Sequence, residues 1–351
     1  MPGAPAAVVE GGAPTGKLVR PRAGVRFTGL LVALVALAGV CVASLLVGAQ
    51  DIDPHTVWRL LLHDDGSETA YIVRELRVPR TLVGLLVGAA LGLAGALMQA
   101  LTRNPLADPG LLGVEIGAST AVVLAISLLG VTAPAGYVWF ALAGAGATSV
   151  FVYVLGAAGR AATPERMVLA GAAITAALGA LVGTVLVLDA QTFDQFRFWV
   201  IGSLAGRGMD VFWQVSPFIA VGLGIALLLG RPLNALALGD EAGRALGARI
   251  GETRLVGALA VTLLSGAATA AVGPVGFVGL TVPHVARAIT GPDHRWVLPY
   301  SAVLAPILVL GADVVGRVVG SPGELQVGIV MVLIGGPVFI VLCRRRRIAQ
   351  L

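Results

Sequence analysis

The segment FTGLLVALVALAGVCVASLLVG, residues 27–48, decides the fold class of this chain. It carries no charge, and a helix of this length crosses a hydrocarbon core of about 30 Å. A cleaved signal peptide is the alternative, but its apolar region is shorter, and further apolar segments follow here. Residues 1–26 are rich in Pro, Gly and Ala and carry four basic side chains, so we expect a disordered tail there. The first long apolar segment is therefore predicted to be a membrane span.

Composition extends this prediction to the whole chain of 351 residues. Hydrophobic residues make up 57% and charged residues 12%, and that charge fraction is about half of what soluble domains carry. Nine further apolar segments lie near 82–101, 114–133, 137–157, 167–188, 212–230, 255–273, 277–290, 297–315 and 327–343. Because 277–290 is short for a full crossing, we expect it to work with the irregular GPVG stretch at 273–276. We predict an all-α polytopic membrane protein with about ten transmembrane helices over residues 27–343.

Small residues recur inside the spans. Gly84, Gly88, Gly92 and Gly95 form a ridge that would let a neighbouring helix approach closely, so we assign them to packing. The segments GAALGLAG (88–95) and GAATAAVG (266–273) share the pattern G-A-A-x4-G at a separation of 178 residues. This short echo favours two related five-helix halves, as many transporters have.

The distribution of basic residues predicts the orientation. With ten spans and the N-terminus inside, seventeen of the 24 Lys and Arg residues lie on the cytoplasmic side. The seven on the external side are Arg59, Arg74, Arg77, Arg80, Arg197, Arg207 and Arg317. By the positive-inside rule both termini lie in the cytoplasm, including a basic tail at 344–351. A run of four arginines beside a span is a topological anchor rather than a nucleic-acid site.

The longest cytoplasmic loop, 231–254, contains a short two-faced segment, LALGDEAGRALG (236–247). One helical face carries Leu238, Ala242, Ala245 and Leu246. On another face Asp240 and Arg244 have the spacing of an ion pair, and Asp240 or Gly239 suits the N-cap. So short a helix is marginal alone, and it lacks the basic face and aromatic anchors of a membrane-surface helix. We therefore expect it to dock on a protein partner.

Several motifs resemble the FecCD-type permeases of ABC importers, which carry iron–siderophore complexes, haem or cobalamin. The segment EAGRALG (241–247) is similar to their EAA-x3-G signature, with Gly243 in place of the second alanine. Four longer stretches also resemble this family: RVPRTLVGLLVGAALGLAGALMQALTRNPLADPGLLG (77–113), FWVIGSLAGR (198–207), GPVGFVGLTVPHVAR (273–287) and ELQVGIVMVLIGGPVFIVLC (324–343). The resemblance covers roughly residues 50–345.

The resemblance implies a permease subunit in the cytoplasmic membrane that moves an iron chelate, with a ferric siderophore preferred over cobalamin or haem. It implies three kinds of protein partner: a second permease subunit, identical or homologous, two cytoplasmic ATPase subunits, and an extracytoplasmic binding protein. The loop 231–254 would hold the coupling helix, with ATPase-coupling residues Asp240, Glu241, Ala242, Arg244 and Gly247. Arg77, Arg80 and Arg317 would pair with glutamates of the binding protein, with help from Arg74. The residues that line the substrate path are not assigned.

Other polar residues give no sign of catalysis. His284 invites a proton-relay or iron-ligand interpretation, but no second His, Asp or Glu follows at ligand spacing, so we favour a structural hydrogen bond. Asp189 and Asp313 lie at span ends, and Cys41 and Cys343 are far apart and predict no metal site or disulfide. Walker A, H-E-x-x-H and G-x-S-x-G motifs do not occur, so we expect no enzyme activity and no cofactor in this chain. A gradient-driven secondary transporter would need mid-span carboxylates, and an intramembrane enzyme would need a paired constellation; both are weaker interpretations.

Overall fold

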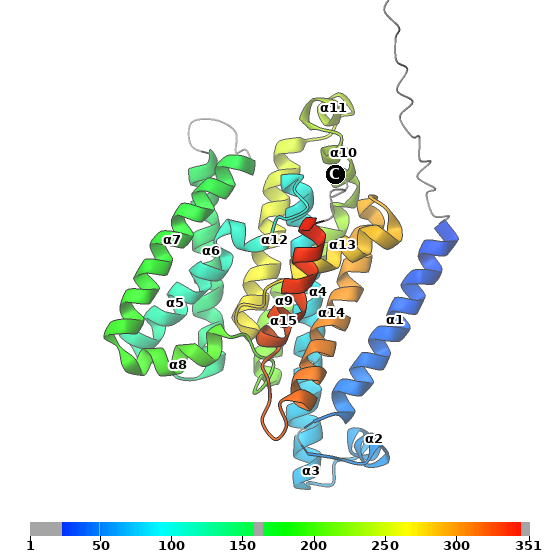
Figure 1. Ribbon diagram of the computed structural model, residues 1–351, viewed down its shortest axis with the longest axis vertical. Helices are drawn as coiled ribbons and strands as arrows, with labels where there is room; N and C mark the ends of the chain where they lie inside the picture. The colour runs from blue at the N-terminus through cyan, green and yellow to red at the C-terminus, as the bar shows by residue number, and fades with distance from the viewer. Residues whose placement is uncertain (1–22, 49, 158–163, 345–351) are drawn as a thin grey trace, which may run out of the picture.

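The computed structural model describes residues 23–48, 50–157 and 164–344. Within these ranges the chain forms helices and no strand (Figure 1). The predicted tails at 1–26 and 344–351 lie mostly outside the described residues. The helices that match the predicted spans are α1 (Ala23–Leu46), α4 (Val78–Thr102), α5 (Val114–Leu129), α6 (Pro134–Ala157), α7 (Pro164–Leu188), α9 (Met209–Leu228), α12 (Ile250–Val272), α13 (Val278–Thr290), α14 (His294–Val319) and α15 (Val327–Arg344). The shorter elements are α2 (Pro54–Leu62), α3 (Glu68–Tyr71), the π-helical η1 (Ile72–Arg77), the 3-10 turn η2 (Pro109–Leu112), α8 (Ala190–Val200), α10 (Gly230–Ala237) and α11 (Asp240–Ala245).

The lengths of these helices confirm an all-α membrane fold with about ten spans. Seven helices are long and apolar enough to cross a membrane, and α5 and α15 are shorter apolar helices. The thirteen residues of α13 span only about 20 Å at 1.5 Å per residue. Gly273 ends α12 with a φ of 80°, and Phe277 precedes α13 with a φ of 67°, a left-handed conformation that is uncommon outside glycine. The GPVG stretch is therefore irregular, and α13 does not cross a hydrocarbon core alone.

The glycine ridge brings α4 against α14 and α13. A Cβ atom at Gly88 would lie 2.5 Å from the Cα of Pro306, and one at Gly92 would lie 2.5 Å from the Cβ of Ala305. A Cβ at Gly95 would collide with the backbone of Gly279 on α13. The assignment of these glycines to packing is confirmed, because only hydrogen fits at these three crossings.

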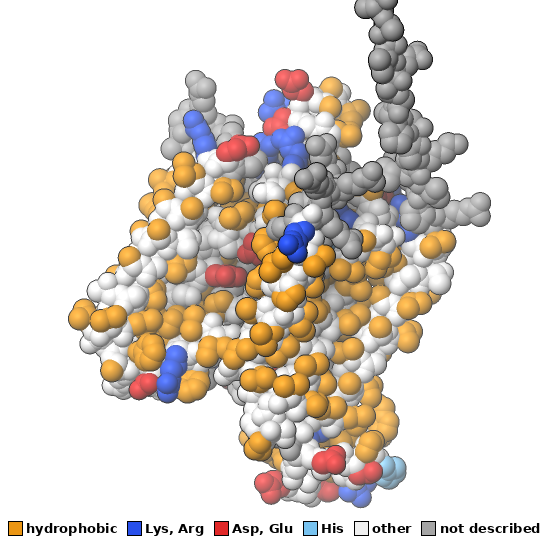
Figure 2. All heavy atoms as spheres, in the orientation of Figure 1, with side chains coloured by type: hydrophobic (Ala, Val, Ile, Leu, Met, Phe, Trp, Pro, Cys, Tyr) orange, Lys and Arg blue, Asp and Glu red, His pale blue; other side chains and the backbone are white. Residues whose placement is uncertain are grey.

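The helix α4 lies at the centre of the molecule, packed against α14, α12 and α13, while α5 to α8 form one flank and α1 the other (Figure 1). On the face drawn in Figure 2, hydrophobic side chains cover the sides of the helices and most charged side chains gather at the two ends. This distribution is expected for a protein surrounded by lipid along its middle. The GAA echo falls on α4 and α12, which pack together and run in opposite directions (Figure 1). The two related five-helix halves stay a prediction, and this antiparallel pair is compatible with them.

Both ends of the described chain, at the start of α1 and the end of α15, lie on the side that carries α11 (Figure 1). The elements α2, α3 and α8 lie on the opposite side. An even number of crossings places the two chain ends on one side, as observed. The predicted coupling segment and the predicted docking arginines lie on opposite sides (Figure 1).

Candidate coupling and docking surfaces

The predicted coupling segment folds into the six-residue helix α11 between two left-handed glycines. Gly239 precedes it with a φ of 99°, and Gly247 follows it with a φ of 81°. Glycine adopts these conformations without the steric penalty of a Cβ atom. Of the two N-cap candidates, Gly239 takes the position and its cap makes no side-chain hydrogen bond. The carboxylate of Asp240 is thereby free for another role.

Asp240 ties α11 to two longer helices. Its Oδ1 accepts a hydrogen bond of 2.9 Å from Arg103, which ends α4, and one of 3.0 Å from Arg254 in the first turns of α12. Among the described residues, the pair that we expected between Asp240 and Arg244 is not formed, so that expectation was wrong. Arg103 and Arg254 lie close enough to Asp240 to pair with its carboxylate, so Asp240 pairs with them instead of with Arg244 one turn along α11. These two ion pairs connect α11 to the central helices.

The close packing around Gly243 explains why glycine replaces the second alanine of the EAA-x3-G pattern. Gly243 is the buried residue of α11, and a Cβ there would lie 2.9 Å from Cδ1 of Ile250 and 3.0 Å from the carbonyl oxygen of Ala235. The predicted coupling residues Glu241, Ala242, Arg244 and Gly247 are exposed. The helix therefore rests on the protein through Gly243 and presents its other faces outward.

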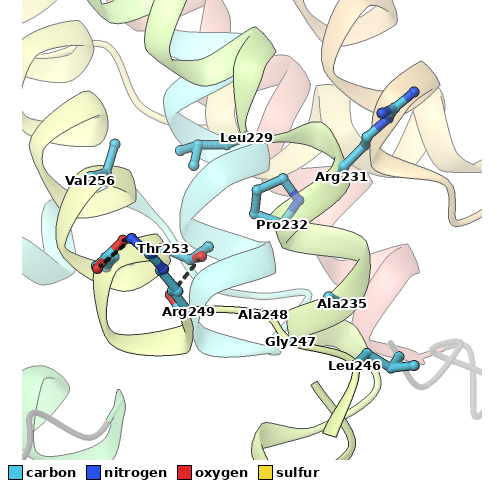
Figure 3. Close-up of a pocket in the computed structure, with 11 residues that line it drawn as sticks. Leu229, Arg231, Pro232, Ala235, Leu246, Gly247, Ala248, Arg249, Thr253 and Val256 are labelled. Atoms are coloured by element: carbon cyan, nitrogen blue, oxygen red, sulfur yellow. Dashed lines mark hydrogen bonds and ion pairs between the residues drawn. The ribbon is translucent and has the colours of Figure 1, made fainter. Parts of the chain in front are cut away.

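The apolar residues beside α11 also face outward, with Leu238 62% exposed and Leu246 69% exposed. Leu246 lines a cavity of about 520 Å³ beside α11. Leu229 reaches this cavity from the turn before α10, Pro232 from α10 and Val256 from α12 (Figure 3). Arg249 at its edge pairs with Glu252 at 3.4 Å. Exposed leucines next to a charged helix and an open cavity form a surface typical of a protein interface.

On the opposite side, two of the predicted docking arginines hold the end of α1. Arg77 donates hydrogen bonds of 2.8 Å to the carbonyl oxygens of Leu45 and Leu46. Arg317 donates to the carbonyl oxygens of Ser44 at 2.8 Å and Val47 at 2.6 Å. The last carbonyls of a helix lack partners within the helix and carry partial negative charge, so cationic donors stabilise them.

Arg80 and Arg317 share the carboxylate of Asp313. Arg80 Nη2 lies 2.8 Å from Oδ1, and Arg317 Nε lies 3.1 Å from Oδ2. Arg80 also donates to Glu324 Oε2 at 2.7 Å. The structure thus brings the three predicted arginines together in one cluster, but it engages them in internal contacts and leaves Arg77 only 5% and Arg317 only 3% exposed. Their role in docking stays a prediction.

Sequence reasoning missed the structural roles of Asp313 and Glu324. The i,i+4 spacing of Asp313 and Arg317 on one helix could have indicated their pair. The contact between Arg80 and Glu324 joins residues 244 positions apart, and no pattern in a single sequence indicates it.

His284 makes the structural hydrogen bond that we favoured. Its Nε2 lies 2.9 Å from the carbonyl oxygen of Pro105, which can only accept, so Nε2 carries the proton. On the neighbouring turn of α13, Arg287 donates to the side chain of Gln99. In the part of the chain that the structure describes, no group of three or more His, Cys, Asp or Glu residues is placed to hold a metal ion. These contacts hold α13 to the end of α4 and the loop that follows it.

The loop after α4 is ordered by two of the polar residues in the stretch NPLADPGLLG. Asn104 accepts a hydrogen bond from the amide of Leu106 at 2.9 Å, and Asp108 accepts one from the amide of Gly110 at 2.8 Å. Burial raises the pKa of Asp108 above its ordinary value, because desolvation disfavours the charged carboxylate.

The comparisons with known proteins agree with this geometry. The family described as the FecCD transport family matches residues 34–345. This chain belongs to the FecCD transport family. Its relatives include the ferric enterobactin transport system permease protein FepD of Escherichia coli (strain K12), which is 46% identical over 319 residues, covering 91% of this chain and 94% of the relative. The hemin transport system permease protein HmuU of Yersinia pestis is 38% identical over 334 residues, covering 94% and 97%.

Among solved structures, an inward-facing conformation of a metal-chelate type ABC transporter is similar in fold to this FecCD family member. The TM-score is 0.80 at 26% sequence identity, and the match covers 91% of this chain and 99% of the other. The fold that the sequence predicted is thus shared over nearly the whole length of both chains.

Proposed function

We propose that this chain is the transmembrane permease subunit of an ABC importer for iron chelates. The observation that carries the proposal is the surface around α11: a short helix fixed to α4 and α12 through Asp240, with its other polar residues exposed. Membership in the FecCD transport family supports the same role. Glu241 and Arg244 would contact a cytoplasmic ATPase, and closure of an ATPase dimer would move α4 and α12 through the two ion pairs of Asp240.

The substrate class is a ferric siderophore. FepD is a ferric enterobactin permease at 46% identity, and a probable siderophore permease of Bacillus subtilis (strain 168), YfiZ, is 39% identical over 312 residues that cover 89% of this chain and 93% of that protein. The hemin permease HmuU, at 38% identity, keeps haem as the alternative, beside cobalamin.

The assembly would contain a second permease subunit, two ATPases on the side of α11, and a binding protein on the side of α2, α3 and α8. This arrangement puts both termini in the cytoplasm of a multi-pass inner-membrane protein, in keeping with the excess of basic residues on that side. No cofactor is assigned to the chain, because the energy of transport would come from ATP bound to partner subunits.

Replacing Glu241 by Lys tests the coupling role. The exposed side chain forms no ion pair or hydrogen bond with any residue that the structure describes, so the variant should reach the membrane at wild-type levels. Reversal of its charge should abolish uptake of ⁵⁵Fe-labelled siderophore in cells that depend on this permease. The matched control is Arg295→Glu in the first turn of α14, which reverses an exposed charge on the same side but outside the loop 231–254 and should leave uptake at the wild-type level. Wild-type uptake by the Glu241 variant would refute the coupling role.

A further inference from the structure

Of the seven arginines predicted to be external, Arg207 alone has no ion pair or main-chain acceptor for its terminal nitrogens among the described residues. The partners of the other six are Asp65 for Arg59, Asp64 for Arg74, main-chain carbonyls for Arg77, Asp313 for Arg80 and Arg317, and Asp194 for Arg197. Arg207 uses only its Nε, which donates to the carbonyl oxygen of Ser203 at 3.3 Å. The side chain is nevertheless buried, with 8% of the residue exposed.

A buried guanidinium without a hydrogen-bonded carboxylate is costly, since burial disfavours the charged form of any side chain. Desolvation lowers the pKa of Arg207 from its ordinary value, and the nearby Tyr137 and Asp210 offset this shift only in part. An arginine stays protonated despite such a shift, so the charge persists and its two terminal nitrogens remain able to donate. Neither terminal nitrogen is among the fully buried polar atoms that lack a hydrogen bond, so both reach solvent and a partner from outside can pair with them.

The segment that carries Arg207 is firmly held. The amide of Ser203 donates to the carbonyl oxygen of Val272 at the end of α12, at 2.8 Å. The carbonyl oxygen of Gly202 accepts from the amide of Gly328 in α15, at 3.1 Å. Both neighbours are spans, so the backbone is anchored four residues before Arg207, and less ordering entropy is lost there than in a free loop when a ligand binds.

Arg207 lines a cavity of about 420 Å³ that lies between its loop and η1. The remaining lining residues are Tyr71, Glu75, Leu76, Gly206, Gly208, Met209 and Asp210. Tyr71 is 59% exposed and Leu76 is 45% exposed. The lining combines arginine, tyrosine and methionine, which protein interfaces favour, with the charged Glu75 and Asp210.

We propose that this cavity receives a carboxylate side chain of the extracytoplasmic binding protein, which pairs with the free terminal nitrogens of Arg207. The proposal rests on the proposed function as a binding-protein-dependent importer. The planar guanidinium matches a carboxylate with two parallel hydrogen bonds. The exposed Glu75 and Asp210 favour a protein over a free polyanionic chelate, because they would repel a polyanion but can face basic side chains of a protein that carries both signs.

The test uses the full permease with its ATPase in nanodiscs and the chelate-free binding protein encoded with it. Arg207→Gln should weaken binding at least about tenfold, since loss of one partner of a desolvated charge pair is costly. Arg207→Lys keeps the charge but loses the two-pronged contact, so we expect an intermediate loss. The matched control Arg197→Gln, which removes an exposed arginine on the same side, should stay within about twofold of wild type.

Melting temperatures show whether each variant is folded. If Arg207→Gln proves unstable, Arg207→Lys decides, because it retains the buried charge. The proposal would be overturned if the folded Arg207→Lys and Arg207→Gln permeases both bound the binding protein with wild-type affinity.

Repeating the measurement with the iron-loaded binding protein separates the two sources of an anionic group. An effect of equal size for the free and loaded forms supports a protein carboxylate. A loss confined to the loaded form would assign Arg207 to the chelate and overturn the proposal. Failure of the wild-type permease to bind the binding protein would instead refute the proposed function, so the two failures are distinguishable.

Discussion

Asp313 is the residue on which the external arginine cluster depends. It is 1% exposed and lies against both Arg80 and Arg317. Asp313→Asn would leave two arginines with one exposed carboxylate, Glu324, between them. Removing one partner from a buried charge network costs about 3–5 kcal/mol, so the melting temperature of the purified protein should fall by many degrees.

The matched control for Asp313 is Glu324→Gln, which removes the other carboxylate that contacts Arg80. Glu324 has a side chain 30% exposed, and a pair this close to water is worth up to about 1 kcal/mol. Similar small shifts in both variants would contradict a central role for Asp313 and would show that water replaces its charge.

At the scale of the element, α4 depends on glycine wherever it crosses α13 and α14. Gly95→Ala would place a methyl group against the backbone of Gly279, and backbone cannot move aside as a flexible side chain can. We expect little folded protein after purification in mild detergent, as judged by size-exclusion chromatography. Gly179→Ala on α7 meets no atom within 4 Å and should behave as wild type. Equal yields of the two variants would refute the tight crossing.

The helix α11 is too short to be stable by itself, so its order depends on the contacts of Asp240 and Gly243. Asp240→Asn weakens both ion pairs, and hydrogen–deuterium exchange of the amides in residues 239–247 should accelerate several-fold. The global melting temperature should change little, because Asp240 is partly exposed, with 28% of its side chain open to solvent. Arg249→Gln breaks an exposed ion pair in the same loop and is the control. Unchanged exchange in Asp240→Asn would show that the helix is held by packing alone.

For the whole molecule, the apolar segments indicated most of the fold. Uncharged runs of about twenty residues have few alternatives to a span, and the shortness of 277–290 already indicated the irregular start of α13. The glycine ridge indicated which face of α4 packs, although not that α14 and α13 would be its partners. A single sequence does not show which distant helices meet.

The candidate sites were harder to predict because their charges are shared among distant segments. The sequence suggested a pair within α11, whereas Asp240 pairs with arginines 137 and 14 positions away. The motif located Arg77, Arg80 and Arg317 but gave no sign of their contacts with α1 and Asp313. Arg207 stood in the motif FWVIGSLAGR without an assigned role. It is buried as Arg77 and Arg317 are, and only its free terminal donors distinguish it from them.

Coupled import requires that a signal entering at the side of α3 and α8 reaches an ATPase at the side of α11. The most direct measurement is ATP hydrolysis by the permease–ATPase complex in nanodiscs, with and without the iron-loaded binding protein. We predict that loaded binding protein stimulates hydrolysis in the wild-type complex, and that Glu241→Lys abolishes the stimulation while the binding protein still docks. Transport of the chelate without any associated ATPase, or full stimulation in the Glu241→Lys complex, would contradict coupling through α11.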